Sequence, residues 1–508
     1  MTADRDAQAA VIAFLEDPDT HGIGEAVEVI TTHSAHVFLA GDRAYKIKRA
    51  VKYNYLDFST LETRRRIIER ELELNAPGAP MIYDRVVAIT RDSTGALAFD
   101  GTGEAVEYAL AMQRFAREDE LDRIAEAGGL SFEIAEKLGV AVAELHASAP
   151  RREADGAALI GEILDELAEA FSDMEEVLGA ARLASFLDSV RSVFDATAPL
   201  LRARAEGGFV RRCHGDLHLK NIVMIDDHPV LFDALEFDER LGITDVFYDF
   251  AFLVMDLLHR GLPRQANAAL NRFLARSGDI GGLATLPLFL SVRAAIRAMV
   301  AVQTMADRAP DGLAREARTY LDAAIAFLAP PPARLVAIGG LSGTGKTTIA
   351  AHLAFRLGPA PGALHLRSDL ERKAMFGVDP LEPLPPEAYS AEVNREVYQR
   401  MIEKAGTALA AGHAAILDAT FLDPEQRVAA ERLARARSVR FDGLWLDAEA
   451  ATLEARVAAR RNDASDADLA VLRRQLARGF DAGDWAGIDA GGTPEEVTAR
   501  AAKALGLD

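Results

Sequence analysis

The sequence predicts two domains: an α+β domain with a β-rich lobe and a helical lobe, then an α/β domain built on a parallel sheet. Three observations predict this. Short β-like runs in residues 25–115 give way to long segments of helical period in residues 120–205 and 245–328. Three consecutive prolines at 330–332 end a helix and stiffen a connector. A short apolar run, a glycine-rich turn and a helical segment follow at 334–357.

Length and composition bound the function. A chain of 508 residues is too long for one core, and 50% hydrophobic with 27% charged residues is ordinary for a globular protein. The formal net charge of −21 counts against binding long nucleic acid or an anionic membrane. We therefore expect small-molecule partners, no long nucleic acid and no membrane, with the oligomeric state left open.

Cysteine usage and hydropathy indicate the compartment. Cys213 is the single cysteine, which excludes intramolecular disulfides and multi-cysteine metal sites. The N-terminus carries acids where a signal peptide would need a basic start. The most apolar later segments are interrupted by charges, namely Asp249, Asp256, Arg293 and Arg297. We expect no membrane span and a cytoplasmic protein.

The elements of the first domain, residues 1–329, follow in order. A small lobe at about 25–115 holds β-like runs around one charged helix, "LETRRRIIERELELN". A helical lobe at about 116–329 is interrupted by "NIVMI" and "PVLFDAL", which flank "DDH" and predict a hairpin. This is the two-lobed layout of kinases. The linker is placed at 330–333 and the second domain at 334–508.

The first candidate site lies just before the hairpin. His214-x-Asp216, followed after four residues by Asn221, matches the H-x-D-x-x-x-x-N catalytic loop of kinases. Asp216 can accept or orient the proton of an attacking hydroxyl, and the Asn221 amide oxygen can reach a metal that bridges phosphates. Asp233 follows the second strand of the hairpin, where a further metal-binding carboxylate is expected.

These residues carry a family resemblance. "HGDLHLKN", "FDALEFD" and "DVFYDFAFL" together resemble the aminoglycoside phosphotransferase and choline-kinase-like group over most of residues 25–328. The resemblance implies a protein-kinase-like fold and Mg-ATP-dependent phosphorylation of a small-molecule hydroxyl. It also implies Asp216 as the base and Asn221 and Asp233 as magnesium ligands, and it makes Asp249 the residue that braces the catalytic loop.

The phosphate-binding part of the first site matches the kinase pattern less completely than the catalytic loop does. A lysine is expected on the third strand, and "AYKIKRAV" offers Lys46 and Lys48 on one strand face. The A-x-K spacing favours Lys46, and Glu71 fits its helix partner better than Glu69. "TTHSAHV" stands where a G-x-G-x-x-G loop would be expected, a departure from the kinase pattern. Residues 108–115 would form the interlobe hinge.

The second candidate site follows the linker. "GLSGTGKT" satisfies G-x-x-x-x-G-K-[ST] between a strand and a helix, the context that this motif demands. The glycines let backbone amides curl around phosphate, the lysine reaches the β- and γ-oxygens, and the threonine ligates magnesium. The predicted nucleotide-binding residues are Gly340, Ser342, Gly343, Thr344, Gly345, Lys346, Thr347 and Thr348, with Thr347 also a metal ligand.

Two aspartates end apolar strands of the second domain. Asp418 ends "AAILD", a Walker-B-like position beside the magnesium. Asp369 follows "ALHLRS", with Arg367 beside it and Arg372 placed to grip a polar substrate. Because ligands collect at the carboxyl ends of parallel strands, both aspartates should face one cleft, and we favour Asp369 as the hydroxyl-activating base.

A basic segment precedes the polar turn "NDASD". Arg456, Arg460 and Arg461 are expected on one helix that acts as a lid, with Arg460 contacting the nucleotide phosphates. The alternative is a solvated basic helix face, and the sequence leaves the two equally open.

The second domain resembles the short ATPase/kinase group that includes gluconate kinase, the zeta-type toxins and the kinase half of polynucleotide kinase. That resemblance implies Asp369 as the activating carboxylate. The fused order resembles a bacterial bifunctional family that joins an aminoglycoside phosphotransferase-like domain to a gluconate-kinase-like one, and "YNYLDFSTLETRRR" adds to the likeness.

The sequence therefore predicts a tandem phosphotransferase with ATP and Mg²⁺ as cofactors and a small hydroxyl compound as acceptor at each site. Two alternatives stay open for the C-terminal half. It could be a kinase of nucleotides, nucleotide sugars or nucleic-acid 5′-hydroxyls, or an ATP-binding regulatory module that gates the first domain.

Overall fold

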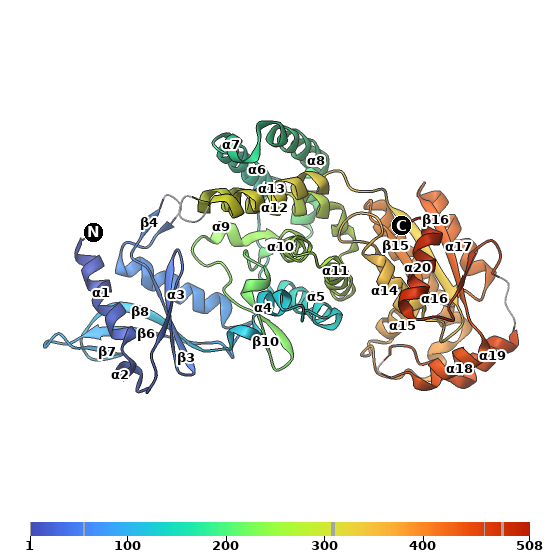
Figure 1. Cartoon of the computed structure of the whole chain (residues 1–508), viewed down its shortest axis with the longest axis horizontal. Helices are drawn as coiled ribbons and strands as arrows, with labels where there is room; N and C mark the ends of the chain where they lie inside the picture. Colours follow the sequence, from blue (N-terminus) through green and yellow to red (C-terminus); the bar gives the residue numbers. More distant parts are fainter. Residues whose placement is uncertain (1, 54–55, 306–309, 462, 479–481, 508) are drawn as a thin grey trace. The chain divides into compact units, whose positions relative to one another are not determined.

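The computed structural model describes the whole chain except residues 1, 54–55, 306–309, 462, 479–481 and 508 (Figure 1). Asn54 and Tyr55 of the "YNYLDF" stretch and Asn462 of the expected lid turn thus lie outside the described residues. The chain packs as two compact units. Unit 1 comprises residues 1–156 and 204–253, and unit 2 comprises residues 157–203 and 254–508. The sequence boundary at 330–333 stays a prediction, since the packing divides the chain elsewhere.

Unit 1 contains the expected β-rich lobe. Its sheet has the order β1-β2-β3-β8-β6-β7, and every neighbouring pair is antiparallel. Helix α1 (Thr2–Glu16) packs Val11 and Leu15 onto one face of the sheet, while α3 (Leu61–Asn75) packs Ile68 onto the other. The strands are β1 (Glu28–Thr31), β2 (Ala35–Ala40), β3 (Arg43–Lys48), β6 (Tyr83–Arg91), β7 (Leu97–Phe99) and β8 (Glu104–Gln113).

The predicted hairpin is confirmed. Strands β10 (Ile222–Ile225) and β11 (His228–Leu231) pair in antiparallel register around Asp226 and Asp227, whose φ angles of 48° and 63° form the tight turn. Strand β9 (Val210–Arg212) pairs with β12 (Ile243–Asp245). The chain between β9 and β10 is the candidate catalytic loop. Unit 1 also holds α2 (Pro18–His21), the short pair β4 (Lys52–Tyr53) and β5 (Leu56–Asp57), α4 (Leu121–Glu126), α5 (Phe132–Ser148) and α9 (Glu239–Gly242).

The long segments of helical period form helices as predicted. Three of these helices join the units covalently, because α6 (Gly156–Ser172), α8 (Ala180–Glu206) and α10 (Val246–His259) each cross a unit boundary. The others lie in unit 2: α7 (Glu175–Leu178), α11 (Pro263–Ser277), α12 (Leu286–Thr304) and α13 (Pro310–Phe327).

The α/β fold with a parallel sheet is confirmed in unit 2. Five strands in the order β14-β15-β13-β16-β17 are all parallel. Apolar strand residues such as Val336, Ile338 and Ile416 are buried against the helices. The elements are β13 (Arg334–Gly340), α14 (Lys346–Ala354), β14 (Leu364–Arg367), α15 (Ser368–Phe376), α16 (Ala391–Ala410), β15 (Ala415–Asp418), α17 (Pro424–Ala436), β16 (Arg440–Asp447), α18 (Ala450–Ala459), α19 (Leu469–Arg478), β17 (Ala486–Asp489) and α20 (Pro494–Leu505).

The edge strand β14 is covered within unit 2 by helix α11. The Asn271 amide donates to the Ala363 carbonyl at 3.2 Å and accepts from the His365 backbone N–H at 2.6 Å. Asn267 donates to the same Ala363 carbonyl at 3.1 Å. These side chains satisfy backbone groups that an edge strand would otherwise leave unpaired. The contact between α11 and β14 helps explain why α11, which precedes the proline linker, packs in the same unit as the parallel sheet, which follows the linker.

One helical stretch, Ile280–Thr304, is long and apolar enough to cross a membrane by length and composition. Its most apolar window is 67% buried inside the protein, as in the core helix of a soluble domain.

Candidate active sites

The catalytic loop of unit 1 brings together Asp216 and Asn221. The Asn221 side-chain nitrogen donates to the Asp216 carbonyl at 2.9 Å and to its carboxylate at 3.0 Å. Because the nitrogen makes both contacts, the amide oxygen of Asn221 is the atom left for the predicted metal contact. The Asp216 side chain is 44% exposed, so a substrate hydroxyl can reach it.

Asp249 braces this loop, as the family resemblance implies. Its carboxylate accepts the backbone N–H groups of His214 at 3.2 Å and Gly215 at 2.8 Å, and it contacts His146 Nε2 at 2.9 Å. Burial opposes ionisation, but the His146 contact and the loop N–H groups outweigh it and lower the pKa of Asp249. The ionised carboxylate therefore fixes the backbone just before Asp216.

Lys46 lies between two carboxylates. Its ammonium is 2.7 Å from Glu71 and 2.6 Å from Asp233. Burial alone would lower the pKa of Lys46, but Asp233 and Glu71 together raise it well above its ordinary value. Asp233 has a left-handed φ of 58°, and its backbone N–H donates to the Tyr83 hydroxyl at 2.9 Å. The structure thus brings together the predicted lysine, its predicted glutamate partner and the carboxylate that was expected to bind metal.

Lys48 has a buried role that the sequence did not reveal. Only 1% of its side chain is exposed, and its ammonium is 2.6 Å from Glu71 and 2.5 Å from Glu236. Burial and the charge of Glu71 raise the pKa of Glu236, while Lys48 opposes the rise. Glu69, the alternative partner, is half exposed and pairs with Arg65. The sequence signal that could have predicted the Lys48 contact is Glu236, which lies three residues after Asp233.

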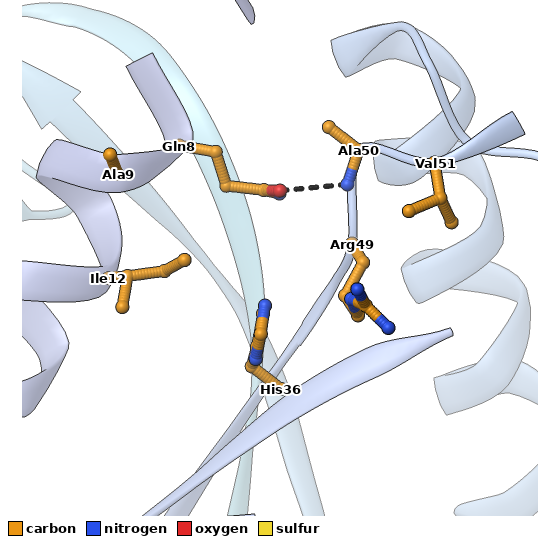
Figure 2. A pocket seen from close by; sticks show the side chains of 7 residues that line it. All are labelled: Gln8, Ala9, Ile12, His36, Arg49, Ala50 and Val51. Atoms are coloured by element: carbon orange, nitrogen blue, oxygen red, sulfur yellow. Dashed lines mark hydrogen bonds between the residues drawn. The ribbon is translucent and has the colours of Figure 1, made fainter. Parts of the chain in front are cut away.

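A hollow of about 310 Å³ lies on the other face of the small-lobe sheet. Figure 2 shows its lining, with Gln8 accepting a hydrogen bond from the Ala50 backbone at 2.8 Å. His36 pairs in register with Ile47, and alternate side chains point to opposite sheet faces. Because Ile47 faces α1 and Lys46 faces α3, the hollow lies away from the first candidate site. It is lined by Gln8, Ala9, Ile12, His36, Arg49, Ala50 and Val51.

The predicted phosphate-binding loop connects β13 to α14. Gly343 and Gly345 have φ angles of 87° and 85°, which side-chain-bearing residues rarely adopt. A Cβ atom on Gly343 would also lie 2.9 Å from the Leu453 carbonyl. The Lys346 ammonium donates to the Leu341 carbonyl at 2.9 Å, and burial lowers its pKa. Of the predicted nucleotide-binding residues, Gly340, Ser342 and Thr344 are buried in this loop and Thr348 is exposed.

Thr347 and Asp418 lie where a magnesium ion would be held. The Thr347 hydroxyl donates to the Asp418 carboxylate at 2.7 Å. Hydroxyl and carboxylate oxygens are the donors that magnesium prefers, so these residues fit that ion, as do Asn221 and Asp233 in unit 1. Burial opposes ionisation of Asp418, but a hydrogen bond from His365 outweighs it and lowers the pKa. His365 is a contact that the motif did not predict.

Asp369 lies close to the charges of the same site. Burial and the nearby charge of Asp418 raise the pKa of Asp369, while Arg367, Lys346 and a hydrogen bond from Ser465 oppose the rise. A raised pKa suits a carboxylate that must accept a proton. The two aspartates thus have opposite electrostatic environments, as expected if one binds metal and the other acts as a base.

The expected lid differs from the sequence prediction. Helix α18 ends at Ala459, so of the three arginines only Arg456 lies within it, because the chain becomes extended at Arg460. Arg456 donates to the carbonyls of Ala490 and Gly492, a structural role, and Arg461 donates to neighbouring backbone carbonyls. Arg460 alone lies near the site, with its Nε 3.7 Å from Asp463.

Comparison with known families gives one match in the region of each candidate site. Residues 85–286 match the model of the phosphotransferase enzyme family, and residues 335–480 match that of the AAA domain. The chain is thus similar to a phosphotransferase over the first matched segment and to an AAA domain over the second, here called the AAA-type domain, and it is a kinase-class enzyme.

Similar proteins match either nearly the whole chain or one part of it. An uncharacterized protein of Mycobacterium tuberculosis is 29% identical over 494 residues, covering 95% of this chain and 96% of the relative. A choline/ethanolamine kinase family protein from Mesorhizobium loti is 14% identical, covering 64% of this chain and 98% of its own, with a TM-score of 0.38. The APS kinase of Mycobacterium tuberculosis is 16% identical, covering 35% and 99%, with a TM-score of 0.25.

Proposed function

We propose that the protein is a cytoplasmic tandem phosphotransferase, in which each domain transfers the γ-phosphoryl group of ATP to a hydroxyl of a small molecule. In support, each site holds a carboxylate beyond those needed to bind a nucleotide. Asp216 is exposed beside Asn221, and Asp369 has a raised pKa beside the phosphate-binding loop. A module that only binds ATP would need Lys346, Thr347 and Asp418, but not Asp369.

The side chains divide the work at each site. In unit 1, Lys46 would bind phosphate oxygens while Glu71 orients its ammonium. In unit 2, Lys346 and the loop amides would bind the phosphates. Magnesium, held by Asn221 and Asp233 or by Thr347 and Asp418, would neutralise phosphate charge. Asp216 or Asp369 accepts the proton of the acceptor hydroxyl as its oxygen bonds to phosphorus and ADP leaves.

The decisive experiment measures ADP formation by the full chain against sugars, amino alcohols, aminoglycosides and nucleosides. We expect Asp216→Asn and Asp369→Asn each to lower turnover about 10²–10⁴-fold for a different set of acceptors. The double variant should lose both activities. Persistence of either activity in the double variant would refute the assignment of the base at the corresponding site.

The same data separate the two alternatives. If Asp369→Asn changes the rate with acceptors of the first site and no acceptor is specific to the second, the AAA-type domain regulates its neighbour. If the activity lost in Asp369→Asn is confined to nucleosides or 5′-hydroxyl oligonucleotides, the second domain is a nucleic-acid-type kinase.

A further inference from the structure

Three arginines from different elements lie in and around the second candidate site. Arg367 ends β14, Arg372 lies in α15, and Arg460 follows α18. Arg367 and Arg372 both act electrostatically on Asp369, and Arg460 acts on the neighbouring Lys346. Asp463 lies between the lid and the strand, 3.5 Å from Arg367 and 3.7 Å from Arg460.

Each of these arginines keeps a buried N–H donor without a protein acceptor among the described residues. The unpaired atoms are Arg367 Nε, Arg372 Nε and Arg460 Nη1. Buried donors are nearly always hydrogen-bonded, because leaving one unpaired costs about 1–3 kcal/mol. Two of these donors, on Arg367 and Arg372, belong to side chains that act on Asp369, and such a pair is suited to a ligand that accepts hydrogen bonds.

Arg372 is a buried cation whose hydrogen-bond partners are neutral. It is only 5% exposed, and its Nη1 and Nη2 donate to neutral acceptors, the Ala388 carbonyl at 2.7 Å and the Asn394 side chain at 2.6 Å. Within the described part of the chain no carboxylate lies within ion-pair distance of Arg372. A buried cation without a counter-ion is costly, and burial lowers the pKa of Arg372.

The next residue along α15 provides the contrast. Lys373 is 2% exposed, and both oxygens of the Asp466 carboxylate lie 2.9 Å from its ammonium. Of these two buried cations in α15, Lys373 thus has a carboxylate within ion-pair distance, whereas Arg372 has only neutral hydrogen-bond partners. Neutral partners hold the Arg372 guanidinium in place and leave its charge available to an anion.

We propose that the acceptor of the AAA-type domain is a hydroxyl compound that already carries a phosphate monoester, bound by Arg372 and Arg367 beside Asp369. This inference rests on the proposed function and names its second substrate class. A phosphate monoester supplies two negative charges and three acceptor oxygens, which match two guanidinium groups. Under the proposed function the first domain produces such esters, so the second transfer would consume a compound of the class that the first one makes.

Two assays on the full chain test the proposal. The Asp216→Asn chain, whose first site is silenced, is offered glycerol phosphate, hexose phosphates and nucleoside monophosphates, each beside its unphosphorylated parent, with gluconate as a carboxylate control. We expect ADP formation with phosphate esters and not with the parents. Arg372→Gln in this background should raise KM for the ester about 10–100-fold with little change in KM for ATP.

The second assay needs no turnover. Inorganic phosphate is added to the full chain saturated with Mg-ADP, which occupies the phosphate-binding loop, and thermal unfolding is followed by tryptophan fluorescence. Both tryptophans of the chain, Trp445 and Trp485, belong to this domain, so the signal is specific to it. Phosphate should raise Tm in the wild type and not in Arg372→Gln. Arg461→Gln is the matched control, because Arg461 donates only to neighbouring backbone carbonyls.

The outcomes distinguish this inference from the proposed function. Turnover of unphosphorylated parents that is insensitive to Arg372→Gln would refute the anion site and leave the kinase activity standing. A phosphate-dependent rise in Tm that persists in Arg372→Gln would also refute it. A rise that requires Arg372, without turnover of any acceptor, would support the anion site and contradict transfer by this domain. If Arg372→Gln does not fold, Arg367→Gln, whose single ion pair is 3.5 Å long, replaces it in both assays.

Discussion

His413 should make the AAA-type domain sensitive to acid. It is 1% exposed just before β15, and its Nε2 is 2.6 Å from the Gly362 carbonyl. Burial lowers the pKa of His413 from its ordinary value of 6.5 to about 4. A histidine with a lowered folded-state pKa contributes stability that is fully present above pH 6.5 and is lost as the pH falls towards 4. At 1.36 kcal/mol for each pH unit, the total loss is about 3 kcal/mol, of which about 2 kcal/mol is reached by pH 5.

Urea unfolding of the full chain at pH 7 and pH 5, followed by tryptophan fluorescence, measures this loss in the domain concerned. His413→Gln should remove most of the pH dependence while lowering stability at pH 7. His228→Gln is the control, because that histidine is exposed and contacts only the Asp226 carbonyl. An unchanged pH dependence in His413→Gln would refute the reasoning, since the slope would then come from other groups.

Two further predictions concern the active sites. Glu71→Gln should destabilise the protein by about 3–5 kcal/mol and weaken ATP binding at the first site, because it removes a buried counter-ion that Lys46 and Lys48 share. Glu69→Gln, which breaks only the exposed ion pair with Arg65, should cost less than about 1 kcal/mol. Circular dichroism during urea unfolding and ATP titration would show this, and equal effects of the two variants would contradict it. Asp369→Asn should lower transfer about 10²–10⁴-fold yet leave the domain at least as stable at pH 7, because a carboxyl with a raised pKa opposes folding once ionised. Asp418→Asn should instead weaken magnesium-dependent nucleotide binding. The reverse pattern in ATP titrations with and without magnesium would overturn this assignment.

The sequence by itself determined the two fold classes and the core of each candidate site. The catalytic loop and the phosphate-binding loop are contiguous motifs whose spacing sets their geometry, so Asp216, Asn221 and Lys346 could be named directly. The hairpin and the parallel sheet followed from short apolar runs and turn residues, because those signals are local.

Only the tertiary structure decided how residues distant in sequence share a partner. Lys46 and Lys48 lie on one strand face, and the fold places Glu71 between them and adds Glu236 to the second. It also ended the lid helix before Arg460 and left Arg372 buried beside neutral acceptors. These features depend on contacts between side chains that are far apart in the sequence. A local sequence motif does not specify which charged side chains become buried or whether a counter-ion lies beside them.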